Sequence, residues 1–143
     1  MITVKEIRNK KDQIKAQEIR HEVFVIGQNV PAELEVDEYE SDAIHYLAFL
    51  NNNPVGAARW RITEQGVKLE RFAVLNEFRG RGVGSAMVEK ILSDIMRDPE
   101  AGDMEIYLHA QMDAIPLYRK FGFVKYGNMF DEAGLMHYAM KLP

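Results

Sequence analysis

The stretch KLERFAVLNEFRGRGVGSAMVEKILSDIM, residues 68–96, decides the fold that we expect. Residues 68–74 have the apolar and β-branched content of a strand, with partial alternation. A glycine-rich turn follows, and from Val83 the apolar residues fall on one face of a helix that ends near Asp98 and Pro99. The stretch therefore predicts a strand, a tight turn and a helix in immediate succession.

The turn has the composition of an anion-binding loop. Three glycines alternate with two arginines and a valine, in the order Arg79, Gly80, Arg81, Gly82, Val83 and Gly84. Glycine lets the backbone approach a ligand closely and present several N–H groups in one direction. The helix that follows adds its positive dipole end, so a phosphate or pyrophosphate is the expected ligand. The alternative is a turn that only joins the strand to the helix.

The spacing of the glycines excludes two common phosphate-binding motifs. A Walker loop requires Lys and then Ser or Thr after its last glycine, but Ser85 and Ala86 follow Gly84. The dinucleotide-binding fingerprint requires a third Gly or Ala three residues after the second glycine, and either Ser85 or Met87 stands there. Neither motif fits this turn.

The spacing that remains is Arg-x-x-Gly-x-Gly, formed by Arg79, Gly82 and Gly84 directly after a strand that ends at Val74. This pattern resembles the pyrophosphate loop of the GCN5-related N-acetyltransferases, the GNAT family. Further matches to a small, poorly characterised bacterial subgroup of that family run in order through nearly the whole chain. They include Gln28, Glu35, Asp37, His45, Arg59, Arg61, Lys68, Gln111, Tyr118, His137 and Met140.

The composition is that of one ordinary soluble domain over residues 1–143, with 47% hydrophobic and 28% charged residues. No apolar run has the length of a membrane span and no secretory pattern is present, so we expect a cytoplasmic protein without a membrane partner. The lack of cysteine excludes disulfides, a thiolate metal site and a Cys nucleophile. A net charge of −4 argues against nucleic-acid binding and slightly favours a cationic or amine substrate.

The rest of the pattern predicts an α+β (mixed α/β) fold. Further strands are expected at residues 2–7, 44–50, 55–62, 104–110, 123–126 and 136–142, with helices at 12–26 and 114–121. The strand–helix–strand order around the turn implies a right-handed crossover and a parallel pair. We therefore expect a mostly antiparallel sheet of about seven strands with one parallel pair, flanked by helices. The expected buried residues of the first helix are Ile14, Ile19, Val23 and Phe24.

An acidic segment, ELEVDEYESD at residues 33–42, holds six carboxylates in ten residues. Runs of like charge usually face water, which favours a solvated loop or short helix. The alternative is a rim that attracts a positively charged amine.

The resemblance implies where acetyl-CoA binds. In the GNAT fold the two parallel strands splay apart and the pantetheine arm lies in the gap, here between residues 69–74 and 104–110. The backbone of Phe72, Ala73 and Val74 is then expected to pair with the pantetheine amides, which needs no particular side chain. The pyrophosphate is expected on residues 79–84, and Gln111 is expected to hydrogen-bond the pantetheine or the substrate.

The absence of cysteine favours direct attack of the amine on acetyl-CoA in a ternary complex, rather than an acetyl-enzyme. A backbone N–H near Val74 is expected to polarise the thioester carbonyl. The resemblance assigns Tyr118 as the general acid, since a phenol with a pKa near ~10 stays protonated at neutral pH. The alternative for Tyr118 is a core tyrosine with a satisfied hydroxyl.

Two residues are candidates for the general base. Glu70 lies on a strand where the family sometimes uses a carboxylate, but it fits equally well as the buried partner of an arginine: Arg59, Arg61 or Arg71. His109 ends the opposite strand, at a position where the subgroup commonly has Asn. Two other histidines, His45 and His137, remain open. The histidines show no metal-ligand spacing, so no metal is predicted.

The resemblance implies an acetyl-CoA-dependent N-acetyltransferase that acts on the primary amine of a small molecule. One alternative is a CoA-binding sensor without turnover. Another is an acyltransferase that uses a different acyl-CoA, an oxygen acceptor, or a peptide or protein amine. Homodimers are common in the family.

Overall fold

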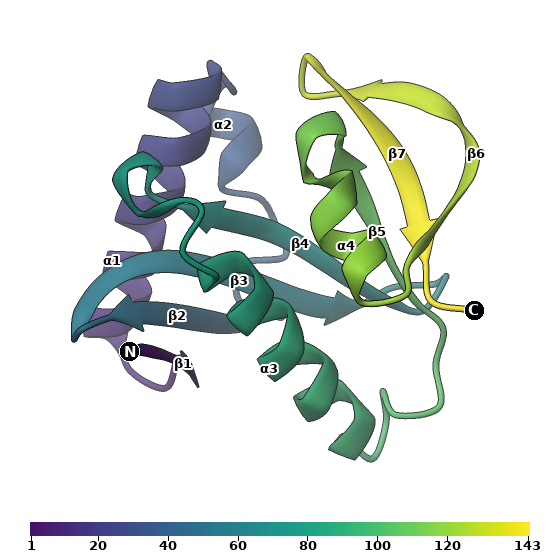
Figure 1. The fold of residues 1–143 in the computed structure, drawn as a ribbon, viewed down its shortest axis with the longest axis horizontal. Coiled ribbons are helices and arrows are strands. Elements are labelled where there is room, and N and C mark those ends of the chain that lie inside the picture. The colour runs from purple at the N-terminus through teal and green to yellow at the C-terminus, as the bar shows by residue number, and fades with distance from the viewer.

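Seven strands form one mixed sheet in the computed structural model, which describes all residues 1–143 (Figure 1). The strand order is β1-β2-β3-β4-β5-β7-β6, and only the β4–β5 pair is parallel. The expected architecture is thereby confirmed. The strands are β1 (Ile2–Glu6), β2 (Ile44–Leu50), β3 (Asn53–Ile62), β4 (Val67–Val74), β5 (Ile106–Gln111), β6 (Val124–Glu132) and β7 (Leu135–Lys141).

Helices cover both faces of the sheet, with α3 in front of it and α1 behind it in the view of Figure 1. They are α1 (Lys10–Arg20), its π-helical continuation η1 (His21–Ile26), α2 (Ala32–Glu35), α3 (Val83–Arg97) and α4 (Ile115–Lys120). Two short 3-10 turns, η2 (Asn76–Phe78) and η3 (Met112–Ala114), precede α3 and α4. None of the helices is both long and apolar enough to cross a membrane.

Each face of the sheet has its own apolar core, because successive side chains of a strand point to opposite faces. Tyr46 and Ala48 of β2 join the larger core under α3 and α4, whereas Leu47 between them joins the smaller core under α1 and η1. The face of α3 that packs on the sheet carries the apolar residues expected from their spacing. They are Val83, Met87, Val88, Ile91 and Ile95, all at most 1% exposed.

One expected core residue of the first helix is not buried. Ile19, Val23 and Phe24 are buried as predicted, but Ile14 is 46% exposed. Ala16 is the central buried residue of α1, at 1% exposure. Residues two apart are separated by about 200° around an α-helix, so Ile14 points away from the sheet. The prediction was wrong because it counted apolar residues without placing Ala16 on the buried face.

The parallel pair is short, and this opens the sheet. β4 and β5 pair only at Val67↔Ile106, Lys68↔Tyr107 and Leu69↔Leu108, after which the strands separate. On its other side this part of β4 still pairs with β3, at Glu70, Ala73 and Val74, so residues 70–74 form a free strand edge inside the sheet. The gap lies between the two strands that the family resemblance implies, but it begins only after Leu69 and Leu108, so residues 106–108 of the expected range are paired.

Two irregularities shape the walls of this gap. The β3–β4 register shifts between Ala57 and Arg59, and Arg71 opposite takes a positive φ of 60°. β6 is longer than the strand expected at 123–126, because a second register shift between Tyr126 and Phe130 lets its pairing with β7 resume and run to Glu132. This extension brings Glu132 toward the gap.

Candidate active site

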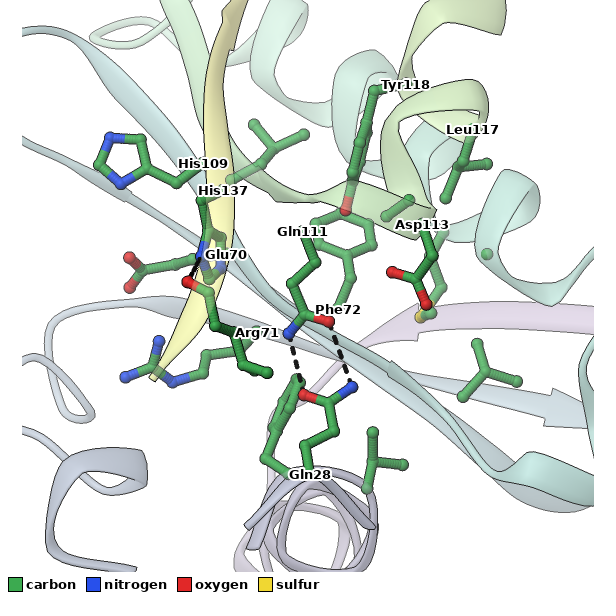
Figure 2. A pocket seen from close by; sticks show the side chains of 18 of the residues that line it. Gln28, Glu70, Arg71, Phe72, His109, Gln111, Asp113, Leu117, Tyr118 and His137 are labelled. Carbon is green, nitrogen blue, oxygen red and sulfur yellow. Dashed lines mark hydrogen bonds between the residues drawn. The ribbon is translucent and has the colours of Figure 1, made fainter. Parts of the chain in front are cut away.

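A cleft of about 870 Å³ lies along the gap between β4 and β5. One end is lined by the glycine-rich turn, the start of α3 and α4. The other end is lined by charged and histidine side chains of β4, β5, β6 and β7. Figure 2 shows Gln111 between these two ends, with Tyr118 and Leu117 on one side and His109 and His137 on the other.

The glycine-rich turn forms the N-terminal start of α3. Gly80 and Gly82 have φ values of 76° and 89°, in the left-handed region that residues with a side chain adopt only at a cost. The first N–H groups of a helix have no partners within it, so they are available to a ligand. Arg79 donates its Nε–H to the Val74 carbonyl at 3.1 Å, which ties the turn back to β4.

Five of the six turn residues line the cleft, namely Arg79, Gly80, Gly82, Val83 and Gly84. Arg81 does not, and its guanidinium lies 5.7 Å from the centre of the Phe78 ring. A Cβ on Gly84 would lie 3.3 Å from Leu117 Cδ2, so glycine here also lets α4 approach α3 closely. Lys120, which donates to Ser85 Oγ at 2.6 Å, adds a cation at this end.

Tyr118 sits on α4 with its ring in the core and its side chain lining the cleft. Its ring makes edge-on contacts with Phe72 at 5.8 Å and with Phe123 at 6.0 Å between ring centres. In Figure 2 its hydroxyl points toward Gln111 and Phe72. Burial raises the pKa of this phenol above its ordinary value, which keeps the proton on the oxygen.

Toward the end of the free edge of β4, the side chains point alternately into the cleft and into the core under α1. Phe72 and Val74 line the cleft, whereas Ala73 is 2% exposed and belongs to the core under α1. An unpaired strand edge presents N–H and C=O groups to any extended partner. The pairing of this edge with pantetheine remains a prediction.

Glu70 is surrounded by three cations. Its carboxylate accepts hydrogen bonds from Arg59 Nε at 2.7 Å and Arg61 Nε at 2.9 Å, and Lys68 Nζ lies 3.3 Å away. Burial acts to raise the pKa of Glu70, but the charges of Arg59, Lys68 and Arg61 outweigh it and hold this pKa below its ordinary value. These contacts favour the ion-pair partner over the general base, and Arg71 is not one of the partners.

The acidic segment contributes most of the remaining charge near the cleft. Asp37 pairs with Arg59 at 2.7 Å and with Arg71 at 3.1 Å, while Glu40 pairs with Arg59 at 2.7 Å. Glu35, only 4% exposed, pairs with Arg20 at 2.7 Å. Both expectations are wrong for these three carboxylates, which neither face water nor lie free to attract an amine. The solvated interpretation holds for the exposed members, Glu33, Glu38 and Asp42.

His109 and His137 share one carboxylate at the charged end of the cleft. His109 Nδ1 lies 2.9 Å from Glu132 Oε1, and His137 Nε2 lies 3.9 Å from Glu132 Oε2. The hydrogen bond to His109 lowers the pKa of Glu132 to about 2, so this side chain stays ionised. His45, in contrast, is buried outside the cleft, with its Nε2 at 2.7 Å from the Glu40 carbonyl.

A pair of amides crosses the cleft. Gln28 donates to Gln111 Oε1 at 3.2 Å, and Gln111 donates back to Gln28 Oε1 at 2.9 Å (Figure 2). Gln28 follows η1, and Gln111 ends β5, so this Gln28–Gln111 amide pair joins two parts of the chain that are 83 residues apart. Gln111 therefore lies in the cleft as expected, although its present partner is another side chain.

Sequence reasoning missed two of these residues. Gln28 carried a signal, since it was among the matches to the bacterial subgroup, but nothing in the sequence paired it with Gln111. Glu132 carried none, because the strand expected at 123–126 ended before the register shift that brings it to the cleft.

The fold and the cleft are those of an acyl-transferring enzyme. A model of the acetyltransferase (GNAT) domain matches residues 9–143, so the chain belongs to the GNAT family of acetyltransferases.

Relatives agree with this assignment. The uncharacterized N-acetyltransferase YjcF of Bacillus subtilis is 40% identical over 136 residues, which cover 94% of this chain and 95% of that protein. The crystal structure of an acyl-CoA N-acyltransferase from Pseudomonas aeruginosa superposes with a TM-score of 0.84 at 26% identity, covering 100% of this chain and 99% of that one. Arabidopsis thaliana Naa50, in complex with the bisubstrate analogue CoA-Ac-MVNAL, has a TM-score of 0.71 at 27% identity, covering 98% and 97%.

Proposed function

We propose that this acetyltransferase moves an acetyl group from acetyl-CoA to the primary amine of a small molecule by direct attack in a ternary complex. The observation that carries the proposal is the cleft itself. It joins a glycine-rich helix start, a free strand edge and a protonated tyrosine in one continuous space.

The donor end of the cleft has the features that a CoA thioester requires. The first N–H groups of α3, its dipole and the cations Arg79 and Lys120 suit a pyrophosphate. The free edge of β4 at residues 70–74 suits the extended, amide-containing pantetheine. The Pseudomonas structure is of a protein described as an acyl-CoA N-acyltransferase, and the Naa50 complex holds a CoA analogue, which supports the same donor here.

Tyr118 is the proposed general acid. The amine nitrogen forms a bond to the acetyl carbon, and collapse of the tetrahedral intermediate breaks the C–S bond. The departing thiolate then takes the Tyr118 proton, which the raised pKa of the phenol keeps in place until that step. A backbone N–H of β4 near Val74 is the proposed donor to the developing oxyanion.

Glu70 is a poor candidate for the base that deprotonates the amine. A carboxylate held by Arg59, Arg61 and Lys68 gives up its favourable contacts when it takes a proton. We assign it to fixing these cations beside the cleft, while His109 stays a candidate for the base.

Thiol release from acetyl-CoA tests the proposal, with a panel that contains amino acids, polyamines, aminoglycosides and short peptides. We expect saturable release that depends on at least one amine, and a mass increase of one acetyl group on that amine. CoA binding by calorimetry without release on any acceptor would instead favour the sensor. Release only with peptides would indicate a peptide or protein acetyltransferase, and release only from longer acyl-CoA donors would indicate transfer of a longer acyl group.

A further inference from the structure

The charged end of the cleft contains a cluster of three titratable side chains from three adjacent strands. His109 of β5, Glu132 of β6 and His137 of β7 all line the cleft, and Phe130 packs against both imidazoles. The Phe130 ring centre lies 5.1 Å from that of His109, edge-on, and 5.9 Å from that of His137, stacked. The rings of both histidines are thus held by the same aromatic side chain.

Hydrogen bonding determines which nitrogen of His137 is free. Its Nδ1 lies 2.8 Å from the Leu135 carbonyl, which can only accept, so Nδ1 carries the proton. The neutral ring therefore has its lone pair on Nε2. At 3.9 Å from Glu132 Oε2, this nitrogen is too far for a hydrogen bond but close enough for attraction once it becomes protonated.

The position of His137 on the sheet favours it over His109. His137 is the cross-strand partner of Gln111, and side chains directly opposite on an antiparallel pair lie side by side on one face. Gln111 is beyond the point where β4 and β5 separate, whereas His109 immediately follows the last pair, Leu69↔Leu108. His137 therefore stands deeper in the open part of the cleft.

We infer that His137 Nε2 accepts a proton from the ammonium form of the acceptor, and that Glu132 is the positioning residue that stabilises the resulting imidazolium. This inference rests on the proposed function. It requires that an acceptor amine reach the cleft beside Gln111.

With these groups, every proton that the reaction moves is accounted for. His137 takes one proton from R–NH3⁺, and the neutral amine attacks the acetyl carbonyl carbon. When the C–S bond breaks, the thiolate receives the Tyr118 proton, and the second proton lost by the nitrogen restores Tyr118. The proton on His137 leaves to water, so the reaction releases the amide, CoA thiol and one proton.

The charged groups around His137 are few. Glu132 reaches it from β6, and His109 on the neighbouring strand β5 contacts the other oxygen of the same carboxylate. Across the cleft on β4, Lys68 and Glu70 pair with each other at 3.3 Å, and Arg71 pairs with Asp37 at 3.1 Å. Glu132 is thus the one carboxylate in direct range of Nε2 that does not already hold an arginine or lysine in an ion pair.

The test compares His137→Gln, His109→Gln and Glu132→Gln, with His21→Gln as the control at an exposed position outside the cleft. For the best acceptor, we expect His137→Gln to lower kcat/KM by about 10²-fold or more and to remove the acidic limb of its pH profile. The loss should shrink for an acceptor amine that is already neutral at the assay pH. CoA affinity should stay within about twofold in every variant, since the donor end is untouched.

Glu132→Gln gives a readout that does not depend on turnover. In the free enzyme, the titration of the His137 ring followed by NMR should move to lower pH, because the imidazolium loses its carboxylate. The inference is overturned if His137→Gln keeps the acidic limb, if His109→Gln removes it instead, or if the His137 titration is unchanged in Glu132→Gln. Wild-type protein that binds CoA but acetylates no amine would instead refute the proposed function, whatever the NMR shows.

Discussion

At the scale of single residues, the most informative side chain is Tyr118. Its hydroxyl hydrogen-bonds to no other residue, although the ring is packed between Phe72 and Phe123. A core tyrosine with a structural role usually gives its hydroxyl a partner. A buried ring with its hydroxyl free at the cleft is better explained by a proton that is used in the reaction.

Tyr118→Phe separates these two roles. Removing a hydroxyl that has no partner leaves no unsatisfied group, so the melting temperature should change by no more than about 2 °C. Turnover should fall by roughly 10²-fold while CoA affinity stays constant, because the thiolate loses its proton source. Tyr126→Phe, which removes a hydroxyl bonded to Gln65 Nε2 outside the cleft, is the control and should keep full turnover. Wild-type kcat in Tyr118→Phe would disprove the assignment.

The glycines of the turn allow a second test with a closely matched control. Gly80 and Gly127 have nearly the same φ, 76° and 73°, and an added Cβ would meet no atom within 4 Å at either position. Alanine at either site should cost about the same, roughly 1–2 kcal/mol of unfolding free energy. Only Gly80 lines the cleft, so only Gly80→Ala should weaken CoA binding, by about tenfold or more in calorimetry. Equal CoA affinities in the two variants would contradict the pyrophosphate assignment.

At the scale of elements, the Gln28–Gln111 amide pair connects the segment after η1 to the end of β5 across the open cleft. The pair lies between the donor end and the charged end of the one cleft. An acceptor that reaches Tyr118 from the charged end passes beside these two amides.

A double-mutant cycle measures this link. Gln28→Ala and Gln111→Ala should each destabilise the fold modestly, and the double variant should reveal a coupling of about 1 kcal/mol. Amide hydrogen exchange of residues 27–30 should become faster in both single variants. Gln65→Ala breaks a comparable bond to Tyr126 and should leave exchange at residues 27–30 unchanged. Strictly additive effects would show that the two amides act independently.

The elements also show what the sequence could and could not predict. The strand, turn and helix at residues 68–96 were predictable because local periodicity and glycine spacing determine them. The partners of Glu70 and the acidic segment were not, since they depend on which strands become neighbours. A single register shift in β6 places Glu132 at the cleft. A local irregularity of this kind cannot be predicted from the alternation of apolar and polar residues.

At the scale of the whole molecule, a network of ion pairs joins the acidic segment to the sheet. Arg59 is 0% exposed and contacts Asp37, Glu40 and Glu70 together. A buried guanidinium is tolerated only while carboxylates compensate its charge. The stability of the fold near the cleft therefore depends on the ionisation of these three acids.

The pH dependence of stability follows from the direction of their pKa shifts. Burial acts to raise the pKa of Asp37, Glu40 and Glu70, but the neighbouring arginines outweigh it and hold the pKa of each carboxyl below its ordinary value. A lowered folded-state pKa contributes stability that is complete above the unfolded-state value and is lost as pH falls through the folded-state value. Urea unfolding should thus show a decline in free energy below about pH 4.5 from these three acids. Buried His45 adds an earlier, shallower loss below about pH 6.5, because burial lowers the pKa of its imidazole and the unfolded chain takes up that proton first.

Glu70→Gln tests whether this network causes the decline. It leaves Arg59 with less compensation, so it should cost roughly 3 kcal/mol at about pH 7 and flatten the decline at acidic pH, because one titrating partner is gone. Glu33→Gln removes an exposed carboxylate of the same segment that forms no ion pair, and it should match the wild type at every pH. If Glu70→Gln kept the full acidic decline, Glu70 would not be a source of the acid sensitivity. The loss would then belong to Asp37 and Glu40, which also hold Arg59, or to Glu132 beside its two histidines, and the same substitution at each position would separate them.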